Sequence, residues 1–365
     1  MIYLDNGATS YRKPRSVRSA MNWAIEHCAN PGRGGYREAM AASGTVLSCR
    51  EAAGAMFGCQ PEQVVFTSNC THGLNIAIHS LVKPGDPVLI TGFEHNAVTR
   101  PLFGVGARVM VAGRKLFDWD DTLDQWEKSL KTRPKAAIFT HVSNVFGYIL
   151  PVEQMAALCR QYGVPFIVDA AQSAGMLAID LEKWGADFIA VPGHKGLLGP
   201  QGTGLLLCGR HPEPWMRGGT GSNSLEQAMP DFLPDLAEAG TLNVPGIAGL
   251  LAGIRYVNQI GMDNILRREK NQATECVKAL RKKGYTVFAG DHQSGTVSFV
   301  PAGDCEEMAA HLASRGIAVR AGLHCAPLAH ESTGTLKTGT VRVSFGHDAS
   351  PWQTQAFLQA ISHLS

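Results

Sequence analysis

The chain has 365 residues, of which 45% are hydrophobic and 18% charged, and its formal net charge is +2. This composition is that of an ordinary globular protein; it excludes a charge-rich disordered chain and favours no nucleic acid or other polyanion as a partner. A chain of this length is expected to form a large domain with a smaller companion, because single cores seldom grow further.

The N-terminal residues and the cysteines bear on the compartment. Residues 1–6 have neither the basic leader nor the apolar core of a signal peptide, and no apolar stretch approaches the length of a membrane span. The nine cysteines form no Cys-x-x-Cys pair, and their odd number leaves at least one unpaired within the chain. We therefore expect a cytoplasmic protein in a reducing compartment, with no membrane association.

Short apolar runs alternate with helical patterns between about residues 60 and 210. This alternation predicts a mainly parallel sheet with helices on both faces. A helix that opens at Pro151 favours right-handed crossover connections between the strands. Seven strands are predicted, over residues 64–66, 87–91, 108–111, 136–140, 165–168, 188–191 and 204–208.

After residue 246 the pattern changes to a long helix over about residues 248–282. Strands are then predicted near residues 295–300, 317–320 and 341–345. A final helix begins at Pro351, and its expected buried stripe comprises Trp352, Ala356, Phe357, Ala360, Ile361 and Leu364. The predicted organisation is an N-terminal segment near the active site (1–15), a large α/β domain (16–246) and a smaller α+β domain (247–365).

Two polar side chains follow predicted strands of the first region. Asp169 ends one apolar run and Lys195 follows another, so both would lie at the carboxyl ends of strands, where open α/β sheets place ligands. An acid that faces a pyridinium nitrogen and a lysine that forms a Schiff base are the groups that pyridoxal phosphate requires. The alternative is that Asp169 caps a helix and Lys195 is a solvated loop residue, and the pair alone favours that alternative.

Other predicted strand ends also carry polar groups. Backbone amides in residues 67–73, together with the Thr71 hydroxyl, would form an anion site at a helix start, unless hydroxyl side chains simply cap that helix. His95 follows the next strand and would stack on a cofactor ring or be merely structural. The uncharged side-chain amides of Asn144 and Gln172 could form the hydrogen bonds that a phenolic oxygen of a cofactor requires. Because the loops at one edge of a sheet converge in space, polar groups at several strand ends favour a ligand-binding site at that edge.

The second region contains a candidate nucleophile. Cys325 lies in a polar, glycine-bearing loop, and the neighbouring His324 and Arg320 would favour its thiolate. A zinc site of His324, Cys325 and His330 is the alternative, but the spacing matches no common structural site and no fourth ligand is evident, so we expect no metal. Arg342, polar among apolar neighbours, would hold a carboxylate bidentately or else be an exposed strand residue.

Taken in order, these motifs resemble those of the class V aminotransferase family and, within it, cysteine desulfurases of the Suf type. The resemblance covers nearly the whole chain, and only the Cys325 motif points to desulfurase chemistry. It implies the fold type I of pyridoxal phosphate enzymes. The matching motifs are YLDNGAT at residues 3–9, EH at 94–95, VDAAQ at 168–172, GHK at 193–195, EAGT at 238–241 and RAGLHC at 320–325.

The resemblance implies a role for each of four residues around the cofactor ring. Lys195 would hold pyridoxal phosphate as a Schiff base, and Asp169 would pair with the pyridine nitrogen. His95 would stack on the ring, and Gln172 would bond the phenolic oxygen.

The resemblance also implies how the phosphate is held. Thr71, His72 and His194 would lie at the phosphate, and Thr241 would reach the cofactor of a second subunit, which implies a homodimer. Pro192 stands where these enzymes often have a phosphate-binding serine, and His72 replaces a frequent acidic residue. Because proline has no donor, part of the phosphate contact must come from elsewhere, such as residues 218–221.

The implied reaction converts L-cysteine to L-alanine. Asn144, Arg320 and Arg342 would bind the substrate, Lys195 would remove its α-proton, and Cys325 would take the sulfur as a persulfide for an acceptor protein or a small thiol.

Three alternatives to this reaction stay open at this point. They are a selenocysteine lyase acting on L-selenocysteine, another aminotransferase, epimerase or β-lyase of the family in which Cys325 is incidental, and a catalytically silent sulfur-delivery scaffold.

Overall fold

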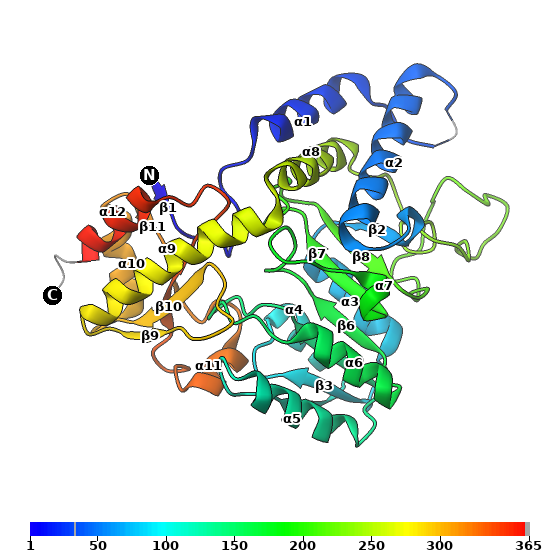
Figure 1. The fold of residues 1–365 in the computed structure, drawn as a ribbon. Helices are drawn as coiled ribbons and strands as arrows, with labels where there is room; N and C mark the ends of the chain where they lie inside the picture. The colour runs from blue at the N-terminus through cyan, green and yellow to red at the C-terminus, as the bar shows by residue number, and fades with distance from the viewer. Residues whose placement is uncertain (33, 362–365) are drawn as a thin grey trace.

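A computed structural model describes residues 1–32 and 34–361. Its larger sheet has seven strands in the order β2-β8-β7-β6-β5-β3-β4 (Figure 1). Strand β8 pairs antiparallel with both β2 and β7, and all the other strand pairs of this sheet are parallel, so the predicted mainly parallel seven-stranded sheet is confirmed. The strands are β2 (Val64–Thr67), β3 (Pro87–Thr91), β4 (Arg108–Ala112), β5 (Ala136–Thr140), β6 (Phe166–Asp169), β7 (Phe188–Pro192) and β8 (Gly204–Cys208).

Helices cover both faces of this sheet, which explains why its central strands are apolar without alternation. Every residue of β5, β6 and β7 is buried. One face packs on α3 and α4, and the other on helices that include α5, α6 and α7. The bounds are α3 (Cys70–Leu81), α4 (Asn96–Gly104), α5 (Trp119–Leu130), α6 (Val152–Tyr162) and α7 (Leu181–Trp184), and a short 3-10 helix (Pro61–Gln63) precedes β2.

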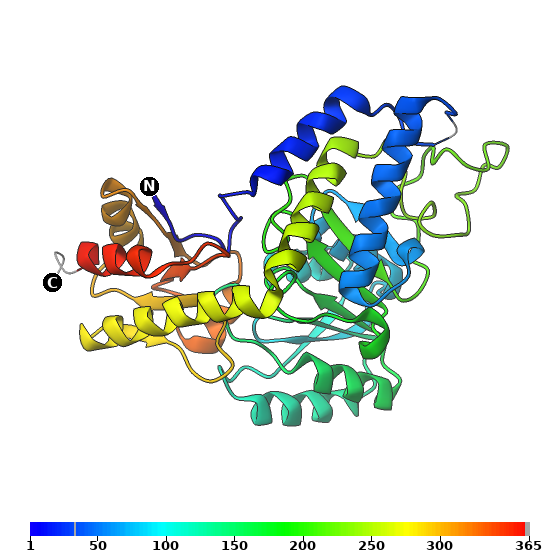
Figure 2. The same ribbon diagram turned by 45° about the horizontal axis from the view of Figure 1, so that its top comes forward.

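The predicted long helix over residues 248–282 is in fact two helices, α8 (Val244–Ile260) and α9 (Met262–Lys282). They meet at Gly261, whose φ of 86° lies in a region that glycine adopts without strain and that breaks the helical path. Helix α8 lies beside α1 (Arg15–His27) and α2 (Arg37–Phe57) (Figure 2) and contributes to the core of the larger sheet. The predicted domain boundary at residue 246 stays a prediction, but the packing of α8 lies on the large-sheet side.

A smaller antiparallel sheet has the strand order β12-β13-β10-β9. The predicted strand over residues 317–320 is wrong as a single element, because β11 pairs with the N-terminal β1 whereas β12 pairs with β13. Strand β9 was not predicted. The bounds are β1 (Ile2–Tyr3), β9 (Thr286–Phe288), β10 (Thr296–Val300), β11 (Ile317–Ala318), β12 (Arg320–Gly322) and β13 (Thr340–Ser344).

Helices α9, α10 (Cys305–Ser314) and α12 (Pro351–Ile361) share a hydrophobic core with the smaller sheet, and α11 (Pro327–Thr333) follows the cysteine loop. The predicted stripe of the last helix is partly wrong. Trp352 is 51% exposed, whereas Phe357 and Ile361 are buried. Leu364 lies outside the described residues.

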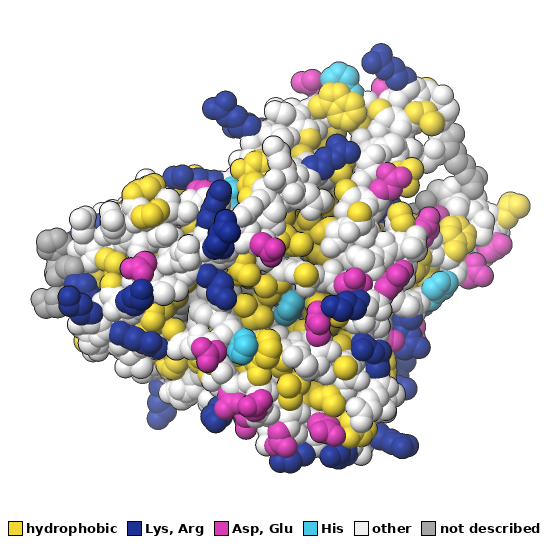
Figure 3. Space-filling view, viewed as in Figure 1, with side chains coloured by type: hydrophobic (Ala, Val, Ile, Leu, Met, Phe, Trp, Pro, Cys, Tyr) yellow, Lys and Arg dark blue, Asp and Glu magenta, His cyan; other side chains and the backbone are white. Residues whose placement is uncertain are grey.

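The N-terminal segment connects the two sheets. Asn6 donates its backbone N–H to the carbonyl of Ser344 in β13, and Ser10 donates to the carbonyl of His194 beyond β7. Basic and acidic side chains are interspersed over the face shown in Figure 3. Within the described part of the chain, no helix has both the length and the apolar character needed to cross a membrane.

Candidate active site

The carboxyl ends of β5, β6 and β7 face a cavity of about 230 Å³ that the N-terminal segment and the smaller sheet close from the other side. All the predicted site residues line it except His72 and Thr241, which line a neighbouring cavity of about 290 Å³. The predicted residues that line the first cavity are Thr71, His95, Asn144, Asp169, Gln172, His194, Lys195, Arg320, Cys325 and Arg342.

Asp169 is the last residue of β6 and is buried. Its Oδ1 accepts from the backbone N–H of Ala171 at 2.9 Å and from the Cys70 thiol at 3.4 Å, and no other described group donates to the carboxylate. Burial and the neighbouring Asp169 raise the pKa of Cys70 well above its usual value, so this thiol stays protonated. Cys70 was not identified from the sequence, where it has the appearance of a core cysteine.

Lys195 follows β7 and lines the cavity. Burial lowers the pKa of its amine, and Asp169 partly opposes that effect. Among the described residues its Nζ makes no hydrogen bond, so the amine is free to react, and its lowered pKa favours the uncharged, nucleophilic form.

The start of α3 forms an anion site. Neither Ser68 nor Thr71 caps the helix; the cap is Asn69, whose Oδ1 accepts from the backbone N–H of His72 at 2.9 Å. The N–H groups of Cys70 and Thr71 have no acceptor among the described residues, and they lie at the positive end of the helix dipole. These two amides and the Thr71 hydroxyl at the cavity wall suit a phosphate.

His95 caps α4, and its Nδ1 accepts from the backbone N–H of Ala97 at 3.0 Å. Burial lowers the pKa of this imidazole to about 4, so near neutral pH it is uncharged, with its proton assigned to Nε2 by that hydrogen bond. The preceding Glu94 is fully buried and accepts from Thr91 Oγ1 at 2.5 Å and from the N–H of Thr140 at 2.9 Å. Glu94 thus fixes the loop that presents His95 to the cavity.

Cys325 is exposed and lies in a strained turn. His324 and Cys325 have φ values of 50° and 57°, and Ala326 donates its N–H to the Leu323 carbonyl at 2.9 Å. Two central residues with positive φ are typical of a type I′ turn, which normally carries Asn and Gly. Side chains with a Cβ pay a conformational cost there, so the surrounding contacts must hold the turn.

Two contacts from the large-sheet side hold the turn. Asn144 donates Nδ2 to the His324 carbonyl at 2.8 Å, and the backbone N–H of Asn96 donates to the Cys325 carbonyl at 2.7 Å. The buried His324 ring faces Thr340, and burial lowers its pKa to about 2. It therefore supplies no positive charge to a Cys325 thiolate, contrary to the expectation from the sequence.

The two arginines of the smaller sheet, Arg320 and Arg342, differ in their ion pairs. Arg342 is 1% exposed, donates to the Asn144 carbonyl at 2.9 Å and pairs with Asp5 at 2.6 Å. It is therefore not an exposed strand residue, and a bidentate bond to a substrate carboxylate would compete with Asp5. Arg320, its neighbour across the strand pair, lines the same cavity and has no ion pair among the described residues.

The proposed zinc ligands do not form a metal site. His324 and His330 have ring centroids 5.8 Å apart in a stacked arrangement. No group of three or more His, Cys, Asp or Glu side chains in residues 1–32 and 34–361 could hold a metal ion.

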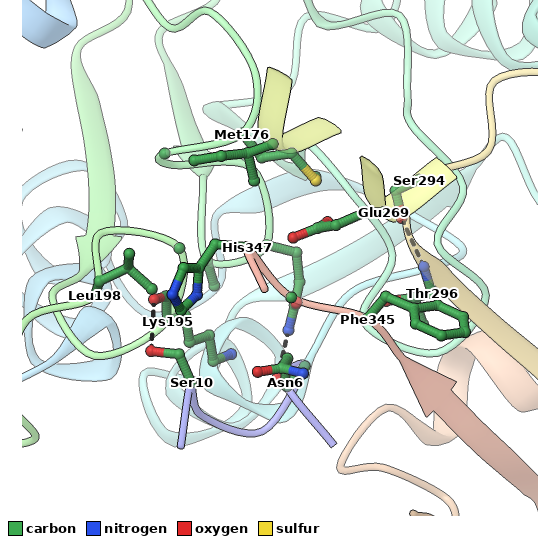
Figure 4. A pocket seen from close by; sticks show the side chains of 17 residues that line it. Asn6, Ser10, Met176, Lys195, Leu198, Glu269, Ser294, Thr296, Phe345 and His347 are labelled. Atoms are coloured by element: carbon green, nitrogen blue, oxygen red, sulfur yellow. Dashed lines mark hydrogen bonds between the residues drawn. The ribbon is translucent and has the colours of Figure 1, made fainter. Parts of the chain in front are cut away.

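A third, smaller cavity of about 50 Å³ adjoins the first, and Lys195 and Gln172 line both. Figure 4 shows the smaller cavity with Lys195 in its wall. Glu269 enters it from α9, and His347 lies across it. Glu269 makes no hydrogen bond or ion pair with other described residues; burial, together with the nearby Asp348, raises its pKa to about 8. This carboxyl is therefore mainly neutral near pH 7.

Comparisons with known proteins agree with this geometry. The model of the family described as "Aminotransferase class-V" matches residues 2–357. Proteins named "Probable cysteine desulfurase" from Pyrococcus abyssi and Methanothermobacter thermautotrophicus are each 33% identical, over 100% of this chain and 94% of theirs. The solved apo structure of a cysteine desulfurase from Thermococcus onnurineus is 32% identical in sequence and superposes with a TM-score of 0.90. The match covers 100% of this chain and 94% of the chain in that structure.

Proposed function

Because the chain belongs to the class V aminotransferase family, we propose that it is a pyridoxal phosphate-dependent cysteine desulfurase that converts L-cysteine to L-alanine and keeps the sulfur as a persulfide on Cys325. The observation that carries the proposal is that an exposed thiol, Cys325, shares one cavity with the unbonded amine of Lys195. A lysine and an acid serve pyridoxal chemistry of many kinds, whereas an accessible thiol beside them can receive sulfur.

The cavity residues fit pyridoxal phosphate. Lys195 offers an amine of lowered pKa to the aldehyde, and Asp169 has one carboxylate oxygen, Oδ2, to which no described group donates. His95 is uncharged and available to stack on the ring, and the start of α3 at Thr71 suits the phosphate. Gln172 donates Nε2 to the Gly7 carbonyl at 2.9 Å and has a second amide hydrogen for the phenolic oxygen. When bound, the cofactor supplies an electron sink for the charge that develops at Cα of the amino acid.

Several expected phosphate contacts are missing from the cavity of a single chain, which supports a homodimer. His194 lines the cavity with Pro192, and burial lowers the pKa of His194 to about 4, so it serves as a neutral donor or acceptor. His72 and Thr241 line the neighbouring cavity, and Gly218 and Gly219 are exposed outside both, so none of these four completes the site within one chain. We propose that Thr241 acts across a dimer interface.

The chain's own groups account for the steps of the reaction. Arg320, free of ion pairs among the described residues, binds the carboxylate of L-cysteine, with Asn144 and Arg342 beside it. The amine of Lys195, whose pKa burial lowers, takes the α-proton and holds it for return to the product. The Cys325 thiol loses its proton and its sulfur attacks the substrate sulfur, so the new S–S bond forms as the substrate C–S bond breaks. The electron pair of that bond stays with Cβ, which takes up one proton, and the products are L-alanine and a Cys325 persulfide.

The nine cysteines are all unpaired, and eight of them are buried or half-buried. We propose a reducing, cytoplasmic setting, because a persulfide-forming thiol must stay reduced between turnovers.

A paired assay of alanine and sulfide tests the function. Purified protein with pyridoxal phosphate, L-cysteine and a reductant is expected to release the two products in equal amounts. Cys325→Ser should abolish sulfide release and keep the absorbance of the bound cofactor, whereas Lys195→Ala should lose the borohydride-reducible adduct. Cys59→Ser, at a half-buried thiol outside the cavity, is the control and should behave as wild type. Undiminished sulfide release by Cys325→Ser would contradict the proposal.

A further inference from the structure

A further hollow, distinct from the cavities described above, opens beside Cys325. It is a groove of about 520 Å³ between α3 and α4, and Thr71, His95 and Cys325 line both this groove and the cavity of Lys195. The thiol thus stands at a junction, with the proposed substrate site on one side and the groove on the other. A hollow of this volume is of the size that binds small molecules.

The wall of the groove is more apolar than polar, and its one charged side chain is basic. Arg100 from α4 lines it, and no Asp or Glu is among its lining residues. Arg100 is exposed and makes no hydrogen bond or ion pair within the described part of the chain. Asn75, His79 and Asn96 add neutral polar groups. An unpaired guanidinium in a groove without acids attracts an anionic ligand and can bind a carboxylate through two parallel hydrogen bonds.

We propose that this groove binds a low-molecular-weight thiol bearing a carboxylate, and that this thiol takes the sulfur from the Cys325 persulfide. The proposal rests on the proposed function, since it needs that persulfide. The groove has a volume of about 520 Å³, and its wall carries a single cation and no acid. The size and the charge therefore favour a small anion.

The transfer needs no further reactant. The thiolate of the bound molecule attacks the outer sulfur of the persulfide, a new S–S bond forms, and the bond between the two sulfurs at Cys325 breaks. Cys325 leaves with the electron pair and takes up the proton that the incoming thiol released. The products are a small-molecule persulfide and the free Cys325 thiol, ready for another L-cysteine.

The experiment separates sulfur loading from sulfur transfer. In the first step, the holoenzyme receives L-cysteine without added thiol, and alanine and the Cys325 persulfide are measured. In the second step, the isolated persulfide form is mixed with mercaptoacetate, mercaptoethanol or cysteamine, which are anionic, neutral and cationic thiols of similar size. The persulfide product is trapped by alkylation and quantified by mass spectrometry.

Charge at residue 100 should govern only the second step. Arg100→Glu is expected to slow transfer to mercaptoacetate about tenfold and Arg100→Gln about threefold, as expected for the reversal and the loss of one exposed charge pair. Neither change should alter transfer to mercaptoethanol, and Arg100→Glu should speed transfer to cysteamine. Lys135→Glu, an exposed charge at the amino end of β5, is the matched control and should leave all three rates unchanged.

Two outcomes overturn the inference while the proposed function stands: an equal slowing for all three thiols in Arg100→Glu, or a wild-type persulfide that none of the three removes. Failure to load sulfur in the first step overturns the proposed function and this inference with it.

Discussion

The side-chain amide of Asn144 donates to the carbonyl of His324 over 2.8 Å, and this bond joins the loop after β5 to the turn that carries Cys325. The carbonyl of Asn144 in turn accepts from Arg342 at 2.9 Å. One residue of the large-sheet side therefore contacts both the turn and the buried arginine of the smaller sheet. The position of the Cys325 thiol relative to Lys195 depends on this contact between the two halves of the molecule.

Asn144→Ala should release the turn. We expect sulfide formation to fall about ten- to a hundredfold, because a displacement of about 1 Å at a reacting group has that effect. Losing the hydrogen bond and leaving the His324 carbonyl unpaired should lower the free energy of unfolding by about 1 to 3 kcal/mol. Asn96→Ala is the control, because Asn96 holds the turn through its backbone N–H. Equal losses of sulfide release in both variants would argue against the account of the turn.

Asp5→Ala should destabilise the fold strongly. It leaves the guanidinium of Arg342 buried without its ion partner, at a cost of about 3 to 5 kcal/mol in the free energy of unfolding. The double variant Asp5→Ala/Arg342→Met should recover part of this loss, because an apolar side chain replaces the stranded charge. Urea unfolding measures both.

The exposed pair of Lys183 and Glu153 provides the comparison for that measurement. Glu153→Ala should change the free energy of unfolding by less than about 1 kcal/mol. A loss in Asp5→Ala no larger than this would show that the Asp5 and Arg342 pair does not stabilise the fold as argued.

Glu269 should make stability fall as the pH rises. Its folded pKa of about 8 lies above the ordinary value for a glutamate, so between these two pH values the folded state binds a proton that the unfolded state has released. The contribution of this proton to the free energy of unfolding is therefore full at acidic pH, declines as the pH rises to about 8 and stays constant above that pH. Glu269→Gln should match wild type near pH 5 and exceed it at pH 8 by on the order of 4 kcal/mol at most.

Urea unfolding of both proteins at the two pH values checks the role of Glu269. The control is Glu275→Gln, at an exposed position of the same helix, which should show no such pH-dependent gain. A constant difference between Glu269→Gln and wild type at pH 5 and pH 8 would refute the role assigned to burial.

Two substitutions of Asn69 should separate an effect on the stability of the fold from an effect on cofactor affinity. Asn69→Ala removes the cap of α3 and should cost about 1 kcal/mol in the free energy of unfolding. Asn69→Asp keeps a capping oxygen and should retain that stability, but its negative charge should weaken pyridoxal phosphate binding by repelling the phosphate. Fluorescence titration of the apoprotein measures the affinity. Tight binding by Asn69→Asp would place the phosphate elsewhere.

Much of the fold followed from local pattern. Each of the seven predicted strands of the larger sheet is present within one residue at either end. Except for the edge strand β4, these strands are almost entirely buried, and such strands are continuous apolar runs. The same logic brought Asp169 and Lys195 to one edge of that sheet. The family resemblance is also confirmed by the match over residues 2–357.

What the sequence did not predict depends on long-range contacts. Asp5 lies in a recognised motif, but its partner Arg342 is 337 positions away. Cys70 is a donor to Asp169 only because α3 begins beside the end of β6. The His324 ring contacts Thr340, 16 positions away, and the turn that carries His324 has positive φ values; residue spacing encodes neither feature.

The most direct test of the central claim is mass spectrometry of the intact holoenzyme after L-cysteine, followed by peptide mapping. The account predicts the added mass of one sulfur atom, located on the peptide that contains Cys325, with one L-alanine formed per sulfur bound. The added mass should disappear in Cys325→Ser and on treatment with a reductant. L-alanine formed with no sulfur on Cys325, or sulfur bound at another cysteine in the Cys325→Ser protein, would contradict it.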